Sequence, residues 1–484
     1  MIKKENKVDD RYHRQELIKG WDQKKLEKSR IVIHGSGKLA NYTSVCLASL
    51  GIGNLEIYDN AKLDSENGFL LYSAYNKNSK AKGLQDKLKE INPNITLKGL
   101  HTKLQGYLLP VIGTPDLIID TTNNPKAKSD LMQYAKSKEI TVISASADEN
   151  KTEIYIVKPG EKQLEAKLEE YVETKQGNIP SMIGGGIITE EARKLLMALP
   201  DDDKPFKNLA YSILTQGRFT KQGNYETTQN GLKGKKVLMI GAGALGNFAG
   251  LGIALEGISK LDIMDHDEVE STNRNRQILF YDSVGKKKAK ALAEKLEDIA
   301  PSVKVRGIVA KLDERSAYFS HNKPDLILDC VDSFAARAVI NYYAVKHNIP
   351  LISGGTNPRS GQVAVYRPGI SACLDCKLKV EKALAEKRKA KSCKHAPDPS
   401  VIMTNQVIGG MMVGEAVRLL KGEASVKRIL KYDSDFPSRG GLIGSGNACK
   451  CTKPNVKTWL EEVDKLVVKK KVIRKVKRRR LNRK

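Results

Sequence analysis

Two stretches of the chain share one pattern of apolar and polar positions. At residues 30–51 and again at 236–257, a short apolar run rich in β-branched residues leads into a glycine turn and then into a helical pattern. A second apolar run follows each stretch and ends in Asp59 in the first copy and Asp265 in the second. The pattern therefore predicts strand, tight turn, helix and strand, twice over.

The likeness between the two copies continues along the chain. PDLIIDTTN at 115–123 matches PDLILDCVD at 324–332, and GGIITEEARKLL at 185–196 matches GGMMVGEAVRLL at 409–420. Between these matches the offset rises from 209 to 224 residues, which marks an insertion of 15 residues in the second copy. A repeat of this size indicates tandem domains and not a solenoid. We expect a first domain over 1–215, a second over 216–455 with a cysteine-containing crossover at 370–408, and a basic helix and tail at 456–484.

Composition is that of an ordinary globular protein. The chain has 484 residues, 40% of them hydrophobic and 29% charged, which is enough for two to four domains with their own cores. The N-terminus is charged with no apolar segment behind it, and no run approaches 18 apolar residues, so we expect a cytoplasmic protein without a membrane span. Cys46 and Cys330 fall in apolar segments and are expected in the core, and an odd total of seven cysteines argues against a disulfide framework.

The net charge of +27 suggests nucleic-acid binding, but much of it lies at one end. Eleven of the last 16 residues, 469–484, are Lys or Arg, which leaves +16 for the rest of the chain. Such runs are usually solvated, and this one could bind an acidic partner or RNA through counterion release. The sequence leaves that choice open.

The glycine turns carry the first chemical signal. Gly241, Gly243 and Gly246 form the G-x-G-x-x-G pattern in which the backbone and a helix N-terminus receive phosphate. Asp265, at the end of the next strand, is placed to accept hydrogen bonds from ribose hydroxyls. These features predict an α/β fold of two tandem Rossmann-like units, each with a mostly parallel, doubly wound sheet. A lone motif of this kind can also be a packing corner.

A dinucleotide-dependent dehydrogenase would be the common interpretation of such a turn. The residues after Asp265 argue against it, because Asn273, Arg276 and Gln277 follow directly and Lys288 begins the next helical pattern. Converging cations suit a triphosphate whose charge grows during nucleotidyl transfer. Asp332 follows a buried strand at the edge where such sheets bind ligands, and its carboxylate suits magnesium.

At these residues the second copy resembles the ThiF/MoeB adenylyltransferase family, which the ubiquitin-activating enzymes and the bacterial sulfur-carrier adenylyltransferases share. The matching pieces are GAGALG, the N-x-x-R-Q of 273–277, the lysine of VGKKK, D-x-x-D followed by Arg337, a CxxC and a late pair of cysteines. The resemblance implies that ATP and the C-terminal Gly-Gly carboxylate of a small β-grasp protein are joined as an acyl-adenylate, with pyrophosphate leaving. It also implies roles for four side chains: ribose binding by Asp265, phosphate binding by Arg276 and Lys288, and magnesium binding by Asp332.

The first copy departs from this set. Asn123 stands where Asp332 stands in the second copy, and the segment 63–72 lacks the cations, so only Lys80 remains. Upstream, RYHRQ at 11–15 resembles the family signature whose second arginine, here Arg14, reaches across a dimer into the partner's ATP site. The corresponding RFTKQ before the second copy has Lys221 at that place. We therefore expect a pseudo-dimer with one working centre, completed by Arg14.

The cysteines of the second copy allow more than one interpretation. Cys373, Cys376, Cys449 and Cys451 supply four thiolates, enough for a closed tetrahedral zinc site, although relatives usually close it with a second CxxC. Cys393 lies in a basic stretch that would lower its pKa, and in the family a cysteine of this crossover can take the acyl group as a thioester. An incidental cysteine, or a metal contact shared with His395, remains an alternative.

The predicted function is that of a single-chain activating enzyme for a ubiquitin-like or sulfur-carrier protein, using ATP, Mg²⁺ and Zn²⁺. A conjugating enzyme or a sulfurtransferase would then be a further partner. The main alternative is a tRNA-modifying dehydratase of the same family, which adenylates a carboxylate on a nucleoside. A scaffold that binds ATP without turnover fits less well with a complete second site.

Overall fold

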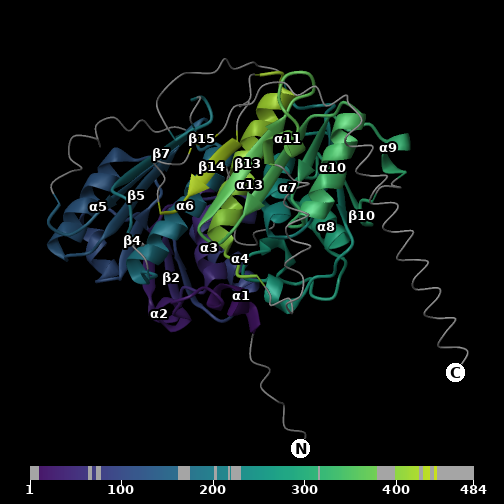
Figure 1. The fold of residues 1–484 in the computed structure, drawn as a ribbon. Helices are drawn as coiled ribbons and strands as arrows, with labels where there is room; N and C mark the ends of the chain where they lie inside the picture. Colours follow the sequence, from purple (N-terminus) through teal and green to yellow (C-terminus); the bar gives the residue numbers. More distant parts are fainter. Residues whose placement is uncertain are drawn as a thin grey trace, which may run out of the picture.

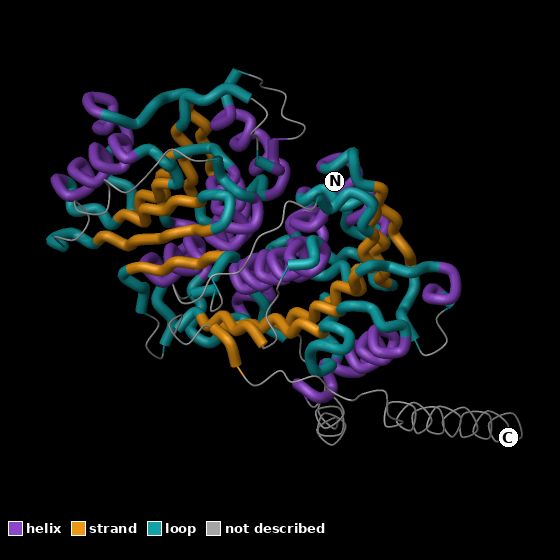
Figure 2. Tube along the Cα trace, turned by 90° about the horizontal axis from the view of Figure 1, so that it is seen from above, coloured by secondary structure: helices purple, strands orange, loops and turns teal. Residues whose placement is uncertain are grey.

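The structure, a computed structural model, shows two α/β units side by side, the first drawn in purple to blue and the second in teal to yellow (Figure 1). It describes residues 10–63, 68–71, 78–161, 175–200, 204–215, 218–219, 231–313, 317–378, 398–423, 429–435 and 441–443. Seen from above, each unit has its own sheet, and helices fill the space between the two sheets (Figure 2). The α/β fold with two tandem units is confirmed.

The first unit is built on a seven-stranded sheet with the order β3-β2-β1-β4-β5-β6-β7. Strands β1 to β5 run parallel, and β6 and β7 are antiparallel additions at one side. The strands are β1 Arg30–His34, β2 Asn54–Tyr58, β3 Thr96–Leu100, β4 Leu117–Asp120, β5 Val142–Ala147, β6 Lys151–Val157 and β7 Asn208–Ser212. The α-helices are α1 His13–Glu16, α2 Gln23–Lys28, α3 Lys38–Leu50, α4 Lys80–Ile91, α5 Pro125–Ser137 and α6 Asn178–Leu196, and the 3-10 turns are η1 Asp10–Tyr12, η2 Phe69–Leu71 and η3 Gly106–Ile112.

The second unit repeats this plan with an eight-stranded sheet of order β10-β9-β8-β11-β12-β13-β14-β15. Strands β8 to β12 run parallel, and β13 to β15 are antiparallel. The strands are β8 Lys236–Ile240, β9 Lys260–Asp265, β10 Lys304–Val309, β11 Leu326–Asp329, β12 Leu351–Thr356, β13 Ser360–Tyr366, β14 Ile429–Asp433 and β15 Gly441–Ile443. The helices are α7 Ala244–Leu255, α8 Lys288–Ile299, α9 Tyr318–His321, α10 Phe334–Lys346, α11 Leu374–Leu378 and α13 Ile402–Leu420, with 3-10 turns η5 Ser271–Asn273 and η6 Ile278–Phe280.

The central strands have apolar middles that are buried, because helices cover both faces of each sheet. Ile31, Val32 and Ile33 of β1 are all fully buried, and so are Leu238 and Met239 of β8. Parallel sheets buried on both faces give continuous apolar runs and not an alternation. The apolar runs in the sequence therefore predicted the right strands.

Helix α6 of the first unit packs against helix α13 of the second at the centre of the molecule (Figure 1). Glycines set their separation: a Cβ on Gly186 would lie 2.8 Å from Val407 Cγ2, and one on Gly410 would lie 2.5 Å from Ile183 Cγ1. One hydrophobic cluster runs through both units without interruption. The two copies thus pack as a pseudo-dimer with a shared core, as expected.

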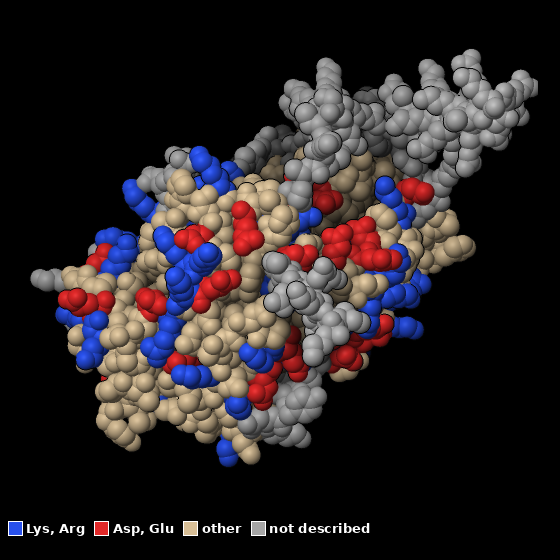
Figure 3. All heavy atoms as spheres, turned by 90° about the horizontal axis from the view of Figure 1, so that it is seen from below, with Lys and Arg blue, Asp and Glu red and all other residues tan. Residues whose placement is uncertain are grey.

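One face of the molecule is mixed in charge. The face seen from below carries Lys and Arg side chains next to Asp and Glu side chains (Figure 3). None of the helices in the described part of the chain has the length and apolarity that a bilayer crossing requires.

Candidate nucleotide-binding site

The glycine turn of the second unit connects β8 to α7. Gly241 has a positive φ of 98°, and a Cβ there would lie 2.8 Å from the Cys330 carbonyl oxygen. A Cβ on Gly246 would lie 2.2 Å from the Gly241 oxygen, so this glycine allows helix and strand to approach. A Cβ on Gly243 would meet no described atom within 4 Å. Gly243 therefore leaves open space at the N-terminus of α7, where a ligand can approach the backbone.

Asn247, which sequence reasoning missed, holds this turn in shape. Its Nδ2 donates to the carbonyl oxygens of Ala242 and Gly243 at 3.2 and 3.0 Å, and its Oδ1 accepts from Leu279 N at 3.0 Å. Asn41 makes the matching contacts in the first unit, to Ser36, Gly37 and Leu70. The identity of these two asparagines at equivalent places in the repeat was the signal that could have revealed them.

Asp265 lies beside the glycine turn, at the end of β9. One carboxylate oxygen accepts from Ala242 N at 2.6 Å and the other from Asp267 N at 2.8 Å. The side chain is half-buried, and both bonds anchor it to backbone. The carboxylate is thus held next to the glycine turn, beside the residue that precedes Gly243.

Arg276 is buried with little to balance its charge. Its Nη1 donates to Thr272 O at 2.9 Å and to Asn275 Oδ1 at 2.8 Å, and both of these acceptors are uncharged. Burial, together with the positive charge of Arg14, lowers the pKa of Arg276 to about 10, with Glu270 opposing the shift. A guanidinium in this state is poised for an anion.

Asn273 and Gln277 flank this arginine. Asn273 Oδ1 accepts from Glu270 N at 3.0 Å and closes a capping box, so in this structure that atom serves the local turn. Gln277 is buried, and its Oε1 has no hydrogen-bond partner among the described residues. Of Asn273 and Gln277, Gln277 is therefore the residue whose amide oxygen can accept a hydrogen bond from a ligand.

Arg14 belongs to the first unit and lies against the second. Its backbone oxygen accepts from Ser400 N at 3.1 Å, and its Nη1 donates to Asp398 O at 3.1 Å. The preceding turn is also attached to the second unit, because Ser271 Oγ donates to Asp10 Oδ2 at 2.7 Å. The structure thus brings Arg14 and Arg276 together from different units, near enough for the charge of one to shift the pKa of the other.

Lys288 and Asp332 belong to the segments that follow β9 and β11, the two strands on either side of β8. Lys288 is the first residue of α8, and its Nζ lies 3.3 Å from Asp267 Oδ2, two residues after Asp265. Asp332 is exposed in the loop between β11 and α10, at the carboxyl edge of the sheet. Both residues therefore lie beyond the carboxyl ends of the strands that flank β8, the strand that leads into the glycine turn.

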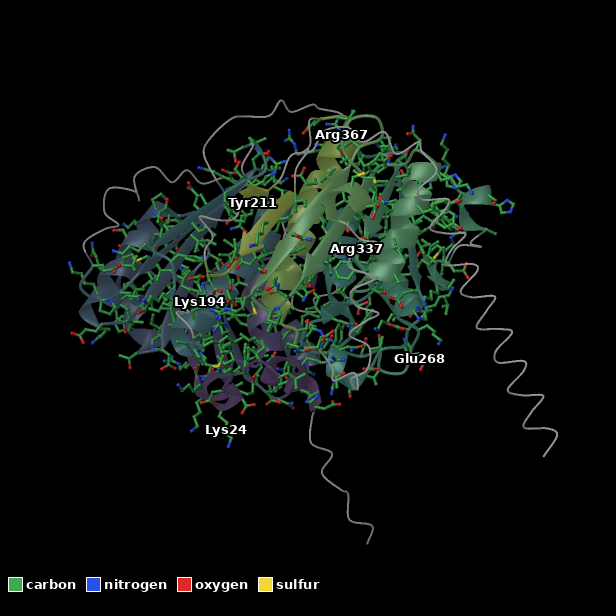
Figure 4. The ribbon with its side chains drawn as sticks, viewed as in Figure 1. Lys24, Lys194, Tyr211, Glu268, Arg337 and Arg367 are labelled. Carbon is green, nitrogen blue, oxygen red and sulfur yellow. The ribbon has the colours of Figure 1, made fainter. Side chains whose placement is uncertain are left out.

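Arg337 supports the loop that carries Asp332 from inside the unit (Figure 4). It lies 3.4 Å from the buried Asp329 carboxylate and donates to Val331 O at 2.6 Å and to Gly354 O at 2.9 Å. Burial raises the pKa of Asp329, and the nearby arginine opposes that shift. In the first unit, Lys128 and Asp120 form the equivalent buried pair at 2.6 Å.

The same region of the first unit is filled by the chain itself. A Cβ on Gly37, the counterpart of Gly243, would lie 2.6 Å from Gln176 Oε1. That oxygen accepts from Leu39 N at 2.9 Å, and Gln176 Nε2 donates to Thr121 O at 3.0 Å. The glutamine side chain thus takes the helix N–H that a phosphate would use.

Asn123 adds a second difference between the units. It is buried, and its Nδ2 donates to Ala147 O at 2.7 Å, whereas its counterpart Asp332 is exposed. An inward-facing amide committed to the neighbouring strand offers neither the charge nor the free oxygen of a metal ligand.

The two copies of the N-terminal motif lie in different surroundings. Arg11 donates to Ile91 O at 2.9 Å, at the end of α4. Its counterpart Arg218 is buried and donates from Nε to Glu415 Oε1 on α13 at 2.8 Å. The sequence match between the motifs therefore did not predict a matching position, and Lys221 lies outside the described residues.

The cysteines divide into three groups. Cys46 and Cys330 are buried in the core, as expected, and burial raises the pKa of both thiols. Cys373 is buried and Cys376 is exposed at the start of α11. The other cysteines of the predicted zinc and thioester chemistry, Cys393, Cys449 and Cys451, lie outside the described residues.

The chain matches the ThiF family twice, over residues 11–210 and 211–451. It belongs to the ThiF family. An adenylyltransferase and sulfurtransferase from Zea mays is 31% identical over 210 residues, which is 43% of this chain and 44% of the relative. An adenylyltransferase and sulfurtransferase from Meyerozyma guilliermondii is 35% identical over 151 residues, which is 31% of this chain and 36% of the relative.

A molybdopterin-synthase adenylyltransferase from Escherichia coli K12 is 31% identical over 213 residues, which is 43% of this chain and 82% of the relative. The chain spans less than half the length of the plant and yeast relatives. The match therefore covers part of each of these relatives and does not carry over what they do as whole proteins.

Proposed function

We propose that the chain adenylates the C-terminal carboxylate of a ubiquitin-like or sulfur-carrier β-grasp protein, using ATP and releasing pyrophosphate. One observation carries this proposal. The charge of Arg14, from the first unit, acts on the buried Arg276 of the second, and the segment after Arg276 is tied through Leu279 N to Asn247, which holds the glycine turn that is open at Gly243. Relatives that are named adenylyltransferases support the same reaction class.

The electrostatics favour a polyanion over a dinucleotide. The positive charge of Arg14 lowers the pKa of the buried Arg276, and the hydrogen bonds of Arg276 go only to uncharged oxygens. Bringing like charges together in a buried place is unfavourable unless an anion joins them. A triphosphate supplies that anion, and Lys288 at the start of α8 adds a further cation to the same loops.

The reaction then follows from these contacts. The partner's carboxylate attacks the α-phosphorus of ATP, a P–O bond to the β-phosphate breaks, and pyrophosphate leaves with its electron pair. Arg14 and Arg276 stabilise the charge that gathers on the phosphates, while Asp265 holds the ribose and Gln277 accepts from the nucleotide. Preorganised cations of this kind stabilise the transition state more than the ground state.

Metal binding is part of the proposal. The exposed carboxylate of Asp332, at the carboxyl edge of the sheet, is a hard oxygen ligand that suits Mg²⁺, which would neutralise charge on the phosphates. Zinc would be held by Cys373, Cys376, Cys449 and Cys451, since four thiolates suit a closed structural site.

The proposal includes a silent first unit. Gln176 occupies its glycine turn, and Asn123 is turned inward to Ala147. Gln176 accepts the N–H of Leu39 that a phosphate would need, and Asn123 has its amide bound to the neighbouring strand where a metal would need a carboxylate. One working centre per chain is the consequence.

Later steps depend on residues outside the described part. Cys393 either takes the acyl group as a thioester, for a conjugating enzyme, or leaves the adenylate to a sulfurtransferase. The basic tail would serve an acidic partner or RNA. A cytoplasmic setting fits the odd number of cysteines.

The test is ATP–pyrophosphate exchange with a small purified protein that ends in Gly-Gly. Exchange should require that protein, fall by at least 100-fold in Asp332→Ala and in Arg14→Ala, and stay near wild type in the matched Asn123→Ala. Exchange that needs tRNA and no protein would favour the dehydratase class instead. Equal losses in Asp332→Ala and Asn123→Ala would refute the silent first unit.

A further inference from the structure

A chain of buried hydrogen bonds leads from the first unit to Arg276 of the second. Gln15 Nε2 donates to Leu50 O at 2.9 Å and to Gln23 Oε1 at 2.7 Å. Gln15 Oε1 accepts from Asn275 Nδ2 at 3.1 Å, and Asn275 Oδ1 accepts from Arg276 Nη1 at 2.8 Å. The two amides therefore connect the backbone of one unit to the guanidinium of the other.

The direction of both amides is fixed by their surroundings. A carbonyl oxygen can only accept, so the nitrogen of Gln15 must face Leu50 and its oxygen must face Asn275. Asn275 must then present its nitrogen to Gln15 and its oxygen to Arg276, which can only donate. Turning the Gln15 amide over would set like groups against each other at three contacts, and turning the Asn275 amide over would do so at two.

The first-unit end of this connection is buried. Gln15 and Asn275 are fully buried, and Gln23 is nearly so. Leu50 ends α3, the helix that begins at the first glycine turn, and Gln23 Oε1 also accepts from Trp21 Nε1 at 3.0 Å. Buried polar groups are costly to leave unpaired, so this connection holds its geometry.

We propose that Gln15 and Asn275 are positioning residues, which hold the Arg276 guanidinium in the orientation that the triphosphate needs. This inference rests on the proposed function for its ligand. The first unit then contributes more than Arg14 to the working centre, because it also orients an arginine of the second unit. Thr272 O, at 2.9 Å from the same Nη1, is the only other acceptor for Arg276 among the described residues.

The experiment measures the dissociation constant for ATP and the kcat/KM of pyrophosphate exchange in the full chain. Gln15→Met and Asn275→Leu keep side-chain volume but break the connection. Each should lower kcat/KM by about 10- to 100-fold, since small misplacements of a catalytic group cost that much. In an Arg276→Ala background, Gln15→Met should have little further effect.

Two further variants separate positioning from folding. The double variant Gln15→Asn/Asn275→Gln moves one methylene group from residue 15 to residue 275. It should recover most of the pyrophosphate-exchange activity that either single substitution loses. Gln406→Met is the matched control, because Gln406 is also fully buried between the units, with Nε2 donating to Met182 O at 2.8 Å. It should lower the melting temperature and leave exchange near wild type.

The outcomes are distinct. The inference is overturned if Gln15→Met leaves both ATP affinity and pyrophosphate exchange at wild-type values. It is also overturned if the double variant is as impaired as the worse single variant, or if the wild type binds no ATP. ATP binding that weakens in Gln15→Met while no Gly-Gly protein supports exchange would keep the positioning role and refute the proposed function.

Discussion

Alanine at Gly243 should weaken nucleotide binding without harming the fold. Gly243 has φ −73° and ψ −156°, which any residue adopts, and a Cβ there would meet no described atom within 4 Å. Alanine is a poorer helix N-cap than glycine but restricts the unfolded chain, and these two terms nearly cancel, which leaves a net change within about 1 kcal/mol. The new methyl group would fill the space in which a phosphate approaches the helix N-terminus.

Alanine substitutions at two other glycines serve as comparisons for Gly243→Ala. A Cβ on Gly246 would lie 2.2 Å from a backbone oxygen, so Gly246→Ala should destabilise the chain by about 1–3 kcal/mol through overpacking. A Cβ on Gly37 would lie 2.6 Å from the end of the Gln176 side chain, which can swing aside at a cost of about 1 kcal/mol for its lost hydrogen bond.

Isothermal calorimetry with ATP and thermal unfolding of the three variants give the comparison. Gly243→Ala should lose at least tenfold in affinity, about 1.4 kcal/mol, with an unchanged melting temperature. Gly37→Ala should keep wild-type affinity. Wild-type affinity in Gly243→Ala, or a loss in Gly37→Ala as large as in Gly243→Ala, would refute the assignment of the nucleotide to the second turn.

Three further predictions concern the first unit and its boundary. Gln176→Ala empties the first glycine turn but supplies no cations, so calorimetry should still give one ATP per chain; two would contradict the silent site. Lys128→Met leaves the fully buried Asp120 without its 2.6 Å partner and should cost about 3–5 kcal/mol in chemical denaturation, whereas a small change would show that the pair is dispensable. Burial raises the pKa of Glu191 to about 7, although the contact with Lys194 opposes the shift. The contribution of Glu191 to the free energy of unfolding is therefore fully present below pH 4.5 and is lost as the pH rises to 7. Glu191→Gln should flatten the pH dependence of unfolding over that interval, and an unaltered slope would contradict this.

The repeat itself made the fold predictable. Each glycine turn lies between an apolar strand and a helix, and local sequence determines this arrangement. The alignment of the two copies also paired residues 185–196 with 409–420, and the structure places these segments in the central helices α6 and α13. Features set by neighbours in sequence, or by their recurrence in a second copy, were thus accessible before the structure.

The contacts that distinguish the two units were not accessible in this way. Gln176 reaches the N–H of Leu39 across 137 residues, and Arg14 reaches Asp398 across 384 residues. No period or spacing encodes such pairs. Arg218 makes the same point, because its motif matches that of Arg11 but Glu415 on α13 gives it a different partner. Side-chain destinations over such distances depend on tertiary packing, and the position of Arg14 was expected only through the family resemblance.

A fused pair of units explains how the two halves can differ so far. In a symmetric dimer, every change at a glycine turn appears in both sites, so a glutamine in the phosphate position would disable the whole assembly. In one chain, Gln176 can close the first turn while Gly243 keeps the second open. Under the proposed function, the first unit is then constrained at the residues that reach its neighbour, Arg14 and Gln15, and not at the counterparts of the second unit's proposed ligand residues. Its N-terminal segment should therefore tolerate substitution far less than the loop that carries Asn123.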